Sequence, residues 1–246
     1  MTESKTDRLR KLIRLPADKS DWEFTSVLIS RPINFILLHL IGNISFITPN
    51  LLTIMGFISF IAAAFILFQI PSMHVLAGVL LFLRLILDDM DGMLARYRGK
   101  GSNFGSYLDK TTDILGFFVF FMVLSYCAFK ETGDFHMFLI GSLGIFGLMG
   151  TGYVKWVVAS MVENKRDAES SLEKDEIKHN PFKVLFTLIF VKIWAVNECD
   201  IMLFSTVGIL FRLPFAWILY VLSLSQALQF TAMLFIRGKQ AYKSGH

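Results

Sequence analysis

The chain has 246 residues, of which 54% are hydrophobic and 18% are charged, and its formal net charge at pH 7 is +4. A soluble domain typically has about 25% charged residues, so this composition excludes an ordinary soluble domain and favours a membrane protein. No aromatic-interleaved basic stretch accompanies the positive charge, so we expect contact with anionic lipids and no nucleic-acid partner.

The first 47 residues are predicted to be a cytoplasmic N-terminal segment. Residues 1–24 are polar and charged, without an apolar core or a small-residue cleavage site, so we expect no signal peptide. The stretch that follows, TSVLISRPINFILLHLIGNISFI, is amphipathic and predicts a helix that lies along the membrane interface.

Residues 48–240 are predicted to form a membrane domain, because six apolar runs approach the length of about 20 residues that crosses a bilayer. Thr48 and Pro49 supply the N-cap and the first helical position of the first run. A charged loop at about 163–183 follows the fourth run. The expected fold is all-α, a polytopic protein with six transmembrane helices at residues 50–69, 74–96, 106–129, 135–162, 197–211 and 213–236.

The Lys and Arg residues predict the orientation of these helices. They concentrate at the N-terminus, in the turn at 96–100, in the loop at 164–183 and in the C-terminal RGKQAYK, whereas the other loops contain little beyond Lys130 and Arg212. Positively charged loops are retained in the cytoplasm. We therefore expect a multi-pass protein whose termini and whose turn at 96–100 face the cytoplasm.

Four carboxylates, those of Asp88, Asp91, Asp109 and Asp113, lie in or beside the second and third apolar runs. Ionised groups near hydrocarbon are energetically costly, so this cluster indicates a functional site. The first pair is spaced i, i+3 and the second i, i+4, so each pair shares one helix face and two opposed faces would form a pocket. Oxygen ligands favour a hard cation such as Mg²⁺, and the run has no Cys or His to bind zinc.

Small and basic residues accompany the carboxylates. Gly92 and Ala95 lie on the same stripe as the first pair, and Gly105 lies one turn before the second pair, which leaves room for a ligand. Arg96 adds a fixed positive charge of the kind that binds phosphate. A site at the cytoplasmic ends of both helices would be reached by a water-soluble molecule from the cytosol and by a lipid from the bilayer.

The spacing of these residues matches a family signature at eight fixed positions: Asp88-x2-Asp91-Gly92-x2-Ala95-Arg96-x8-Gly105-x3-Asp109-x3-Asp113. The chain thereby resembles, over residues 48–115, the CDP-alcohol phosphotransferase family, which includes the CDP-alcohol phosphatidyltransferases. The resemblance implies an enzyme of phospholipid biosynthesis, with the membrane domain of residues 48–240 as its catalytic domain. Such an enzyme transfers a substituted phosphate group from a CDP-alcohol to a second alcohol, one of the two substrates or the product being a lipid, and releases CMP.

The resemblance also implies residue roles, a cofactor and an oligomeric state. Mg²⁺ or Mn²⁺, as two ions, would be bound by the four carboxylates, and Asp113 would act in addition as general base on the attacking hydroxyl. A homodimer is implied as well. The substrate would contact Asn50 at the start of the first helix, the nucleotide-lining positions Gly92, Ala95 and Arg96, and Gly105.

Lys155, in the fourth apolar run, is a further candidate substrate contact. Tyr153-x-Lys155 resembles the Tyr-x-Lys of family members that use glycerol phosphate or inositol phosphate, which implies a phosphorylated acceptor. The charged residues that usually follow are replaced here by apolar ones. A lysine that extends to the cytoplasmic interface is the alternative interpretation.

The direction of transfer stays open at this point. Our leading hypothesis is that CDP-diacylglycerol donates a phosphatidyl group to a polar alcohol, phosphorylated or not. In the alternative, a donor of the CDP-choline or CDP-ethanolamine type passes its head group to diacylglycerol. An alternative of another class is a divalent-cation transporter, because intramembrane carboxylates also mark ion pathways.

Overall fold

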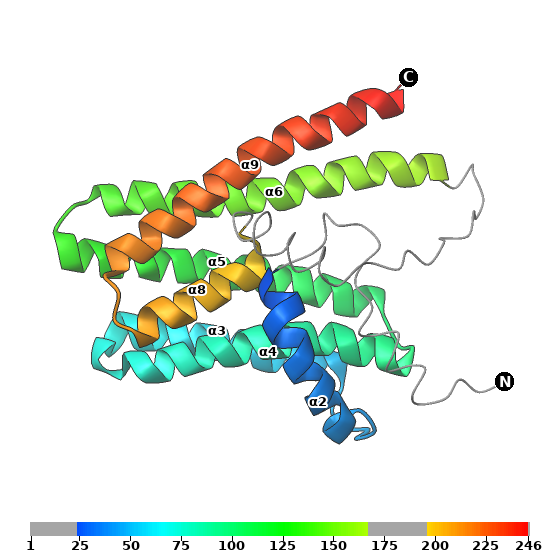
Figure 1. The fold of residues 1–246 in the computed structure, drawn as a ribbon, viewed down its shortest axis with the longest axis horizontal. Helices are drawn as coiled ribbons and strands as arrows, with labels where there is room; N and C mark the ends of the chain where they lie inside the picture. The colour runs from blue at the N-terminus through cyan, green and yellow to red at the C-terminus, as the bar shows by residue number, and fades with distance from the viewer. Residues whose placement is uncertain (1–23, 167–195, 246) are drawn as a thin grey trace.

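The computed structural model describes residues 24–166 and 196–245, and within these ranges the chain is all-helical, as expected. Most helices run along the long axis of the molecule, and α2 crosses them obliquely (Figure 1). A π-helical turn, Ser26–Ser30, precedes α2, and a 3-10 turn, Pro71–Met73, precedes α4. The α-helices are α2 Arg31–Ile41, α3 Pro49–Gln69, α4 His74–Arg98, α5 Asn103–Thr132, α6 His136–Arg166, α8 Glu198–Leu210 and α9 Phe215–Gly245.

Four of these helices are long and apolar enough to cross a membrane, as expected of an integral membrane protein. α4 has 25 residues but carries charged side chains in its C-terminal half, and α8 has 13 residues. The number of six spans therefore stays a prediction. So does the domain division, because residues 1–23 and most of the loop predicted at about 163–183 lie outside the described ranges. The four spans are Pro49–Gln69, Asn103–Thr132, His136–Val158 and Phe215–Tyr242.

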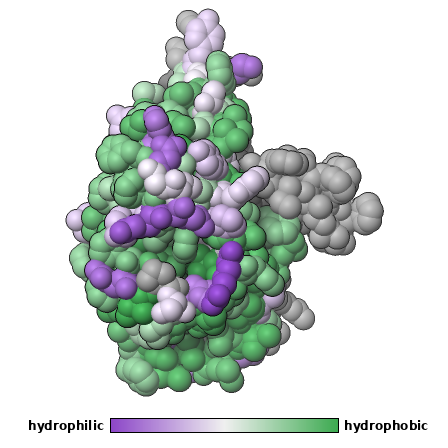
Figure 2. Space-filling view, turned by 90° about the vertical axis from the view of Figure 1, so that its left-hand side faces the viewer, coloured by the Kyte–Doolittle hydropathy of each residue, from purple (hydrophilic) through white to green (hydrophobic). Residues whose placement is uncertain are grey.

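Large apolar side chains cover much of the molecular surface. Phe65, Phe146 and Trp217, which lie on three of the four spans, are 59%, 61% and 69% exposed. Hydrophobic residues also dominate the end of the molecule drawn in Figure 2, where hydrophilic residues form a few patches. An apolar surface of this extent is unusual for a protein surrounded by water and indicates contact with lipid.

The N-terminal helical stretch is attached to α4 and α8 by buried polar contacts. The N–H and hydroxyl groups of Thr25 donate hydrogen bonds to Oδ1 of Asp200 at 2.9 and 2.6 Å, and the hydroxyl of Ser30 donates to Asp89. The stretch Ser26–Ile41 is a short apolar helix. Its position in the membrane interface stays a prediction.

Glycines along one side of α6 allow it to approach α5 and α9 closely. The series Gly141, Gly144, Gly147 and Gly150 repeats at every third residue, and a side chain at any of the four would meet atoms of α5 or α9. A Cβ atom at Gly147 would lie 2.7 Å from the backbone carbonyl oxygen of Gln226. Small residues of this kind let transmembrane helix backbones pack directly against each other.

Gly147→Ala is expected to lower the melting temperature of the purified protein in detergent, because the added methyl group would displace α9. Overpacking of this kind costs about 1–3 kcal/mol. Gly152→Ala, on the same helix, is the matched control: a Cβ atom there meets nothing within 4 Å, and alanine is about 1 kcal/mol more favourable than glycine inside a helix. A Gly147→Ala protein as stable as the control would contradict the close packing of α6 on α9.

Candidate functional site

The connection between α4 and α5 places the carboxylates of the two helices opposite each other. Gly99 follows α4 with a φ angle of 62°, a left-handed conformation that costs glycine little. The hydroxyl of Ser102 then caps α5 by accepting a hydrogen bond from the N–H of Gly105 at 3.0 Å. Both helices pack against α3. The site is thus enclosed by the C-terminal half of α4, the first turns of α5 and the start of α3.

Three of the four predicted carboxylates meet in one cluster. Oxygen atoms of Asp88, Asp109 and Asp113 all lie within 4.8 Å of one another, and Asp113 is the most buried of the three. Asp91 is not part of this group: it is buried beside α3, where its carboxylate accepts a hydrogen bond from the hydroxyl of Thr53. The structure therefore brings together three members of the predicted four-carboxylate site and directs the fourth toward α3.

Arg84 balances part of the charge of this cluster. Its guanidinium lies 2.5 Å from Oδ1 of Asp88, one turn along α4, and donates a hydrogen bond to Oδ1 of Asp113 on α5. The side chain is 2% exposed. Gly56 on α3 provides the space, since a Cβ atom there would lie 3.1 Å from Nη1 of Arg84. The i, i+4 spacing of Arg84 and Asp88 suggests their contact from the sequence alone. The contact of Arg84 with Asp113 depends on the packing of both α4 and α5 against α3 and is visible only in the structure.

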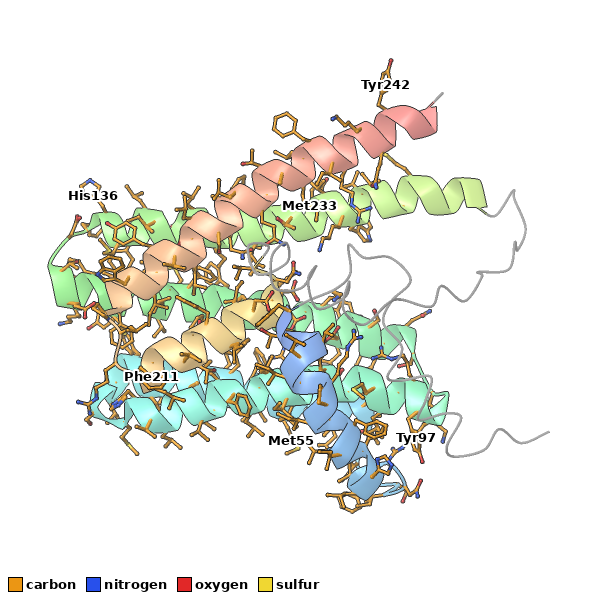
Figure 3. All side chains as sticks on the ribbon, viewed as in Figure 1. Met55, Tyr97, His136, Phe211, Met233 and Tyr242 are labelled. Carbon is orange, nitrogen blue, oxygen red and sulfur yellow. The ribbon has the colours of Figure 1, made fainter. Side chains whose placement is uncertain are left out.

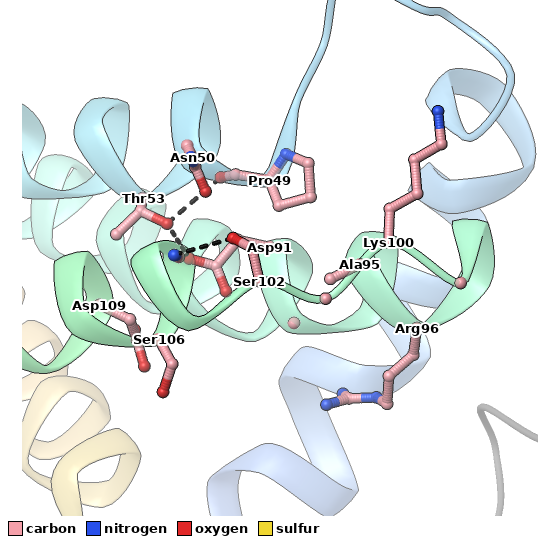
Figure 4. A pocket seen from close by; sticks show the side chains of 14 residues that line it. Pro49, Asn50, Thr53, Asp91, Ala95, Arg96, Lys100, Ser102, Ser106 and Asp109 are labelled. Carbon is pink, nitrogen blue, oxygen red and sulfur yellow. Dashed lines mark hydrogen bonds between the residues drawn. The ribbon is translucent and has the colours of Figure 1, made fainter.

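The predicted substrate residues, apart from Lys155, line one cavity of about 390 Å³ (Figure 4). Asp91 and Asp109 lie in its wall, and Arg96 and Lys100 add positive charge. Glycines make the cavity possible: at Gly105, for example, a Cβ atom would lie 3.0 Å from Oδ1 of Asn50. The lining consists of Pro49, Asn50, Thr53, Asp91, Gly92, Ala95, Arg96, Gly99, Lys100, Gly101, Ser102, Gly105, Ser106 and Asp109. We call this space the first cavity.

Lys155 lies in a second cavity, of about 420 Å³, which is formed by side chains of α5, α6, α8 and α9 and by Asn197. Its lining includes Lys110 and Glu198, residues that spacing along the sequence did not connect with the site. Three polar atoms in this lining have no hydrogen-bond partner among the described residues, although their side chains are buried. They are Oγ1 of Thr151, Oε1 of Gln226 and Oε1 of Gln229.

A third cavity, of about 530 Å³, connects this region with the carboxylate cluster. It shares Lys110 and Glu198 with the second cavity and is also lined by Asp113 and by apolar residues of α5 and α6. Because Asp91 and Asp109 line the first cavity, the carboxylates stand between two spaces. The arrangement would allow two different molecules to approach one cluster, each from its own cavity.

Arg98 fixes the segment between α2 and α3, which precedes the α3 residues that line the first cavity. Its guanidinium donates hydrogen bonds to the backbone carbonyls of Gly42 at 3.0 Å, Ile44 at 2.7 Å and Ile47 at 2.6 Å. The neighbouring Tyr97, at the end of α4 (Figure 3), donates to the side chain of Asn43. The sequence gives only a weak signal for this role, a basic residue in the last turn of a helix.

Comparison with known proteins gives one family match across most of the chain. The family model described as CDP-alcohol phosphatidyltransferase matches residues 46–229. This range includes α3, α4, α5, α6, α8, the first half of α9 and all the residues of the carboxylate cluster.

Individual relatives match over shorter stretches. Archaetidylinositol phosphate synthase from Pyrococcus horikoshii is 45% identical over 69 residues, which is 28% of this chain and 36% of that protein. Phosphatidylinositol phosphate synthase from Mycobacterium tuberculosis is 39% identical over 67 residues, 27% of this chain and 30% of that protein. The aligned stretches thus span about a third of the curated relatives' lengths.

A solved structure is similar over more of the chain. The crystal structure of phosphatidylinositol phosphate synthase from Mycobacterium tuberculosis with CDP-DAG bound aligns with 88% of this chain and 93% of that chain. The sequence identity is 20% and the TM-score is 0.48.

Arg98→Gln is expected to speed amide hydrogen exchange in residues 41–48 by about tenfold or more, because a hydrogen bond from a charged group contributes about 1.5–3 kcal/mol. Exchange followed by mass spectrometry on the purified protein measures this. Lys100→Gln, which removes a nearby exposed charge, is the control and should leave exchange in this segment unchanged. Equal protection in the wild type and the Arg98→Gln protein would show that the turn does not depend on Arg98.

Proposed function

Since the chain belongs to the CDP-alcohol phosphatidyltransferase family, we propose that it transfers a phosphatidyl group from CDP-diacylglycerol to the hydroxyl of a polar alcohol and releases CMP. Because members of this family are transferases, the chain is an enzyme. We therefore no longer retain the hypothesis of a divalent-cation transporter. The observation that carries the proposal is the position of the carboxylate cluster between the first cavity and the third.

In this proposal the cytidine diphosphate part of the donor occupies the first cavity. Arg96 and Lys100 would attract the phosphates, and the small Gly92 and Gly105 leave room for a nucleotide. Asn50 is proposed as a further nucleotide contact because its side chain lies against Gly105. The pyrophosphate would then point toward Asp91 and Asp109, with the diacylglycerol part extending into the surrounding lipid.

The residues of the cluster fit a divalent cation, which we propose to be Mg²⁺ or Mn²⁺. Carboxylate oxygens are the ligands that these hard cations prefer, and three of them already lie within 4.8 Å of one another. We assign Asp88, Asp109 and Asp113 to the cation from their geometry and Asp91 from the family signature. When bound, the cation would offset negative charge on the pyrophosphate oxygens during transfer.

Asp113 is proposed as the general base. It lies at the junction of the cluster and the third cavity, so its carboxylate would face an acceptor that enters from that side. The acceptor hydroxyl would give its proton to Asp113 while its oxygen forms a bond to the phosphorus distal to cytidine. The bond from that phosphorus to the bridging oxygen breaks, and the bridging oxygen leaves with CMP.

We propose that the acceptor binds in the second cavity. Lys110 and Lys155 would bind a phosphate group there, in line with the products named for two relatives, archaetidylinositol phosphate and phosphatidylinositol phosphate. The oxygens of Thr151, Gln226 and Gln229 that have no partner among the described residues would accept hydrogen bonds from acceptor hydroxyls, which would satisfy these buried groups. A phosphorylated polyol therefore suits this lining.

The membrane arrangement follows from the same proposal. α4 would span the bilayer, since 25 residues at about 1.5 Å each reach roughly 37 Å, with its charges near the cytoplasmic end. α8 would be the fifth of six spans. Both termini and the site would face the cytoplasm, the helix Ser26–Ile41 would lie in the interface, and the enzyme would form the homodimer that the family resemblance implies.

Asp113→Asn is expected to reduce CMP release by about 10²-fold or more, because the general base is lost. The assay uses purified protein in detergent with Mg²⁺, and tests CDP-diacylglycerol with inositol phosphate, glycerol phosphate, inositol and serine. Parallel reactions test CDP-choline and CDP-ethanolamine with diacylglycerol. Asp134→Asn, in the turn between α5 and α6, is the control and should keep wild-type activity.

Metal-dependent CMP release with one CDP-diacylglycerol pair, lost in Asp113→Asn and kept in Asp134→Asn, would support the proposal. CMP release with CDP-choline or CDP-ethanolamine would instead support the alternative, in which the head group is transferred to diacylglycerol. If the wild-type protein releases no CMP with any pair, the proposed reaction is wrong.

Lys155→Met is expected to raise the KM for a phosphorylated acceptor about tenfold or more, because it removes a charge-assisted contact. The KM for CDP-diacylglycerol should not change, since that donor occupies the other side of the cluster. Initial rates measured at varied concentrations of inositol phosphate, inositol and CDP-diacylglycerol give the KM of each substrate. Lys239→Met on α9 is the control. An unchanged preference for the phosphorylated acceptor would remove Lys155 from the acceptor site.

A further inference from the structure

Glu198 is the acidic residue among the described residues that line the second cavity, and it also lines the third cavity together with Asp113. The phosphate site proposed above uses Lys110 and Lys155 of the same lining and leaves this carboxylate without a role. A carboxylate weakens the binding of a phosphate beside it, because like charges repel. Its presence in the acceptor site therefore indicates a contact with another part of the acceptor.

The start of α8 holds Glu198 in this position. Asp200 caps the helix by accepting a hydrogen bond from the N–H of Asn197 at 3.2 Å. Two amides of α9 hold the residues before Glu198: Nε2 of Gln229 donates to Oδ1 of Asn197, and Nε2 of Gln226 donates to the backbone carbonyl that precedes Asn197, both at 2.6 Å. Asp200 thus serves as the acidic cap of α8, whereas Glu198 borders the two cavities.

Glu198 interacts electrostatically with both lysines of the second cavity, which come from α5 and α6. For Lys110, the attraction of Glu198 is larger than that of its chain neighbour Asp109, whose carboxylate lies 3.5 Å from the ammonium group. The lining is therefore mixed in charge. An acceptor that binds here would place its phosphate on the lysines and hydrogen-bond donors against Glu198, because an ionised carboxylate only accepts hydrogen bonds.

The order of these groups along the two cavities suits a ring of hydroxyl-bearing carbons. Lys155 lines the second cavity, Asp113 lines the third, and Glu198 lines both. With the phosphate at Lys155 and the reacting hydroxyl at Asp113, the carbons between them would pass Glu198. Trp156 also lines both cavities and offers an apolar face on which the C–H side of such a ring can lie.

We propose that Glu198 determines the specificity for the acceptor: its carboxylate accepts hydrogen bonds from hydroxyls between the phosphate and the reacting hydroxyl, and so selects a cyclic polyol phosphate over glycerol phosphate. This inference rests on the proposed function and adds to it the residue that chooses among acceptors. Inositol phosphate keeps several hydroxyls besides the reacting one, whereas glycerol phosphate keeps a single one. A site built to hydrogen-bond hydroxyls rejects an analogue that lacks them.

The ratio of kcat/KM for inositol phosphate to kcat/KM for glycerol phosphate tests this role, in purified full-length protein with CDP-diacylglycerol and Mg²⁺. Glu198→Gln removes the charge at nearly constant size. The effect of this charge on the two phosphates is the same, so it cancels in the ratio. Glu198→Asp keeps the charge but withdraws the carboxylate by one methylene group. Asp200→Asn is the matched control, because it removes the other acidic group in the first turn of α8, which lines neither cavity.

The wild type should prefer inositol phosphate by about tenfold or more, and both Glu198 variants should lower the ratio by about tenfold, because a hydrogen bond to a charged group contributes that much to binding. Asp200→Asn should lower the melting temperature but keep the wild-type ratio. A ratio unchanged in the Glu198 variants would overturn the inference, even if activity fell, because a merely structural role affects both acceptors alike. If Glu198→Gln does not fold, Glu198→Asp and the wild-type preference decide the question.

Two further outcomes separate this inference from the proposed function. A wild-type enzyme that prefers glycerol phosphate or serine would overturn the role of Glu198 and leave the transfer from CDP-diacylglycerol intact. A wild-type enzyme that releases no CMP with any acceptor would overturn both.

Discussion

The ion pairs of Arg84 with Asp88 and Asp113 join α4 to α5 at the point where the apolar half of α4 passes into its charged C-terminal half. A group of carboxylates brought together beside hydrocarbon would repel one another and lose much of their hydration. The buried guanidinium of Arg84 compensates part of this charge, and Gly56 on α3 leaves the space in which it lies. Without this compensation, the packing of α3 against the charged half of α4 would bury carboxylates that repel one another.

Local backbone chemistry fixes the elements that surround the charged cluster. Gly99 and Ser102 set where α4 ends and α5 begins, and Thr48 caps α3 by accepting a hydrogen bond from the N–H of Leu51. Arg98 links the end of α4 to the turn that enters α3. The first cavity thus has walls that are each held by capping or by backbone hydrogen bonds, which suits a site that must place a phosphate accurately.

The two sides of the cluster differ in chemistry. The first cavity combines basic side chains with glycines, as nucleotide binding requires, whereas the second combines two lysines and Glu198 with buried amide and hydroxyl oxygens. The third cavity is mainly apolar and reaches Asp113 from the side of α6. A transfer reaction between a water-soluble molecule and a lipid-linked one needs separate polar and apolar spaces. The polar molecule must exchange water for polar side chains, whereas the lipid-linked molecule must keep its apolar part away from water.

The sequence by itself determined the all-α membrane character, because long apolar runs leave helices as the structure that satisfies the backbone in lipid. It also determined most helix ends to within about four residues, although α9 continues to Gly245, beyond the span predicted to end at residue 236. The family was determined by the signature, whose eight positions have fixed spacing within a short stretch. Contacts between distant segments were decided by the tertiary structure. The pairing of Arg84 with Asp113, the hydrogen bond from Thr53 to Asp91, and the location of Lys155 in a separate cavity all depend on how α3, α5 and α6 pack. Spacing along one helix specifies which residues share a face, whereas the glycines and side-chain volumes on several helices together decide which faces meet.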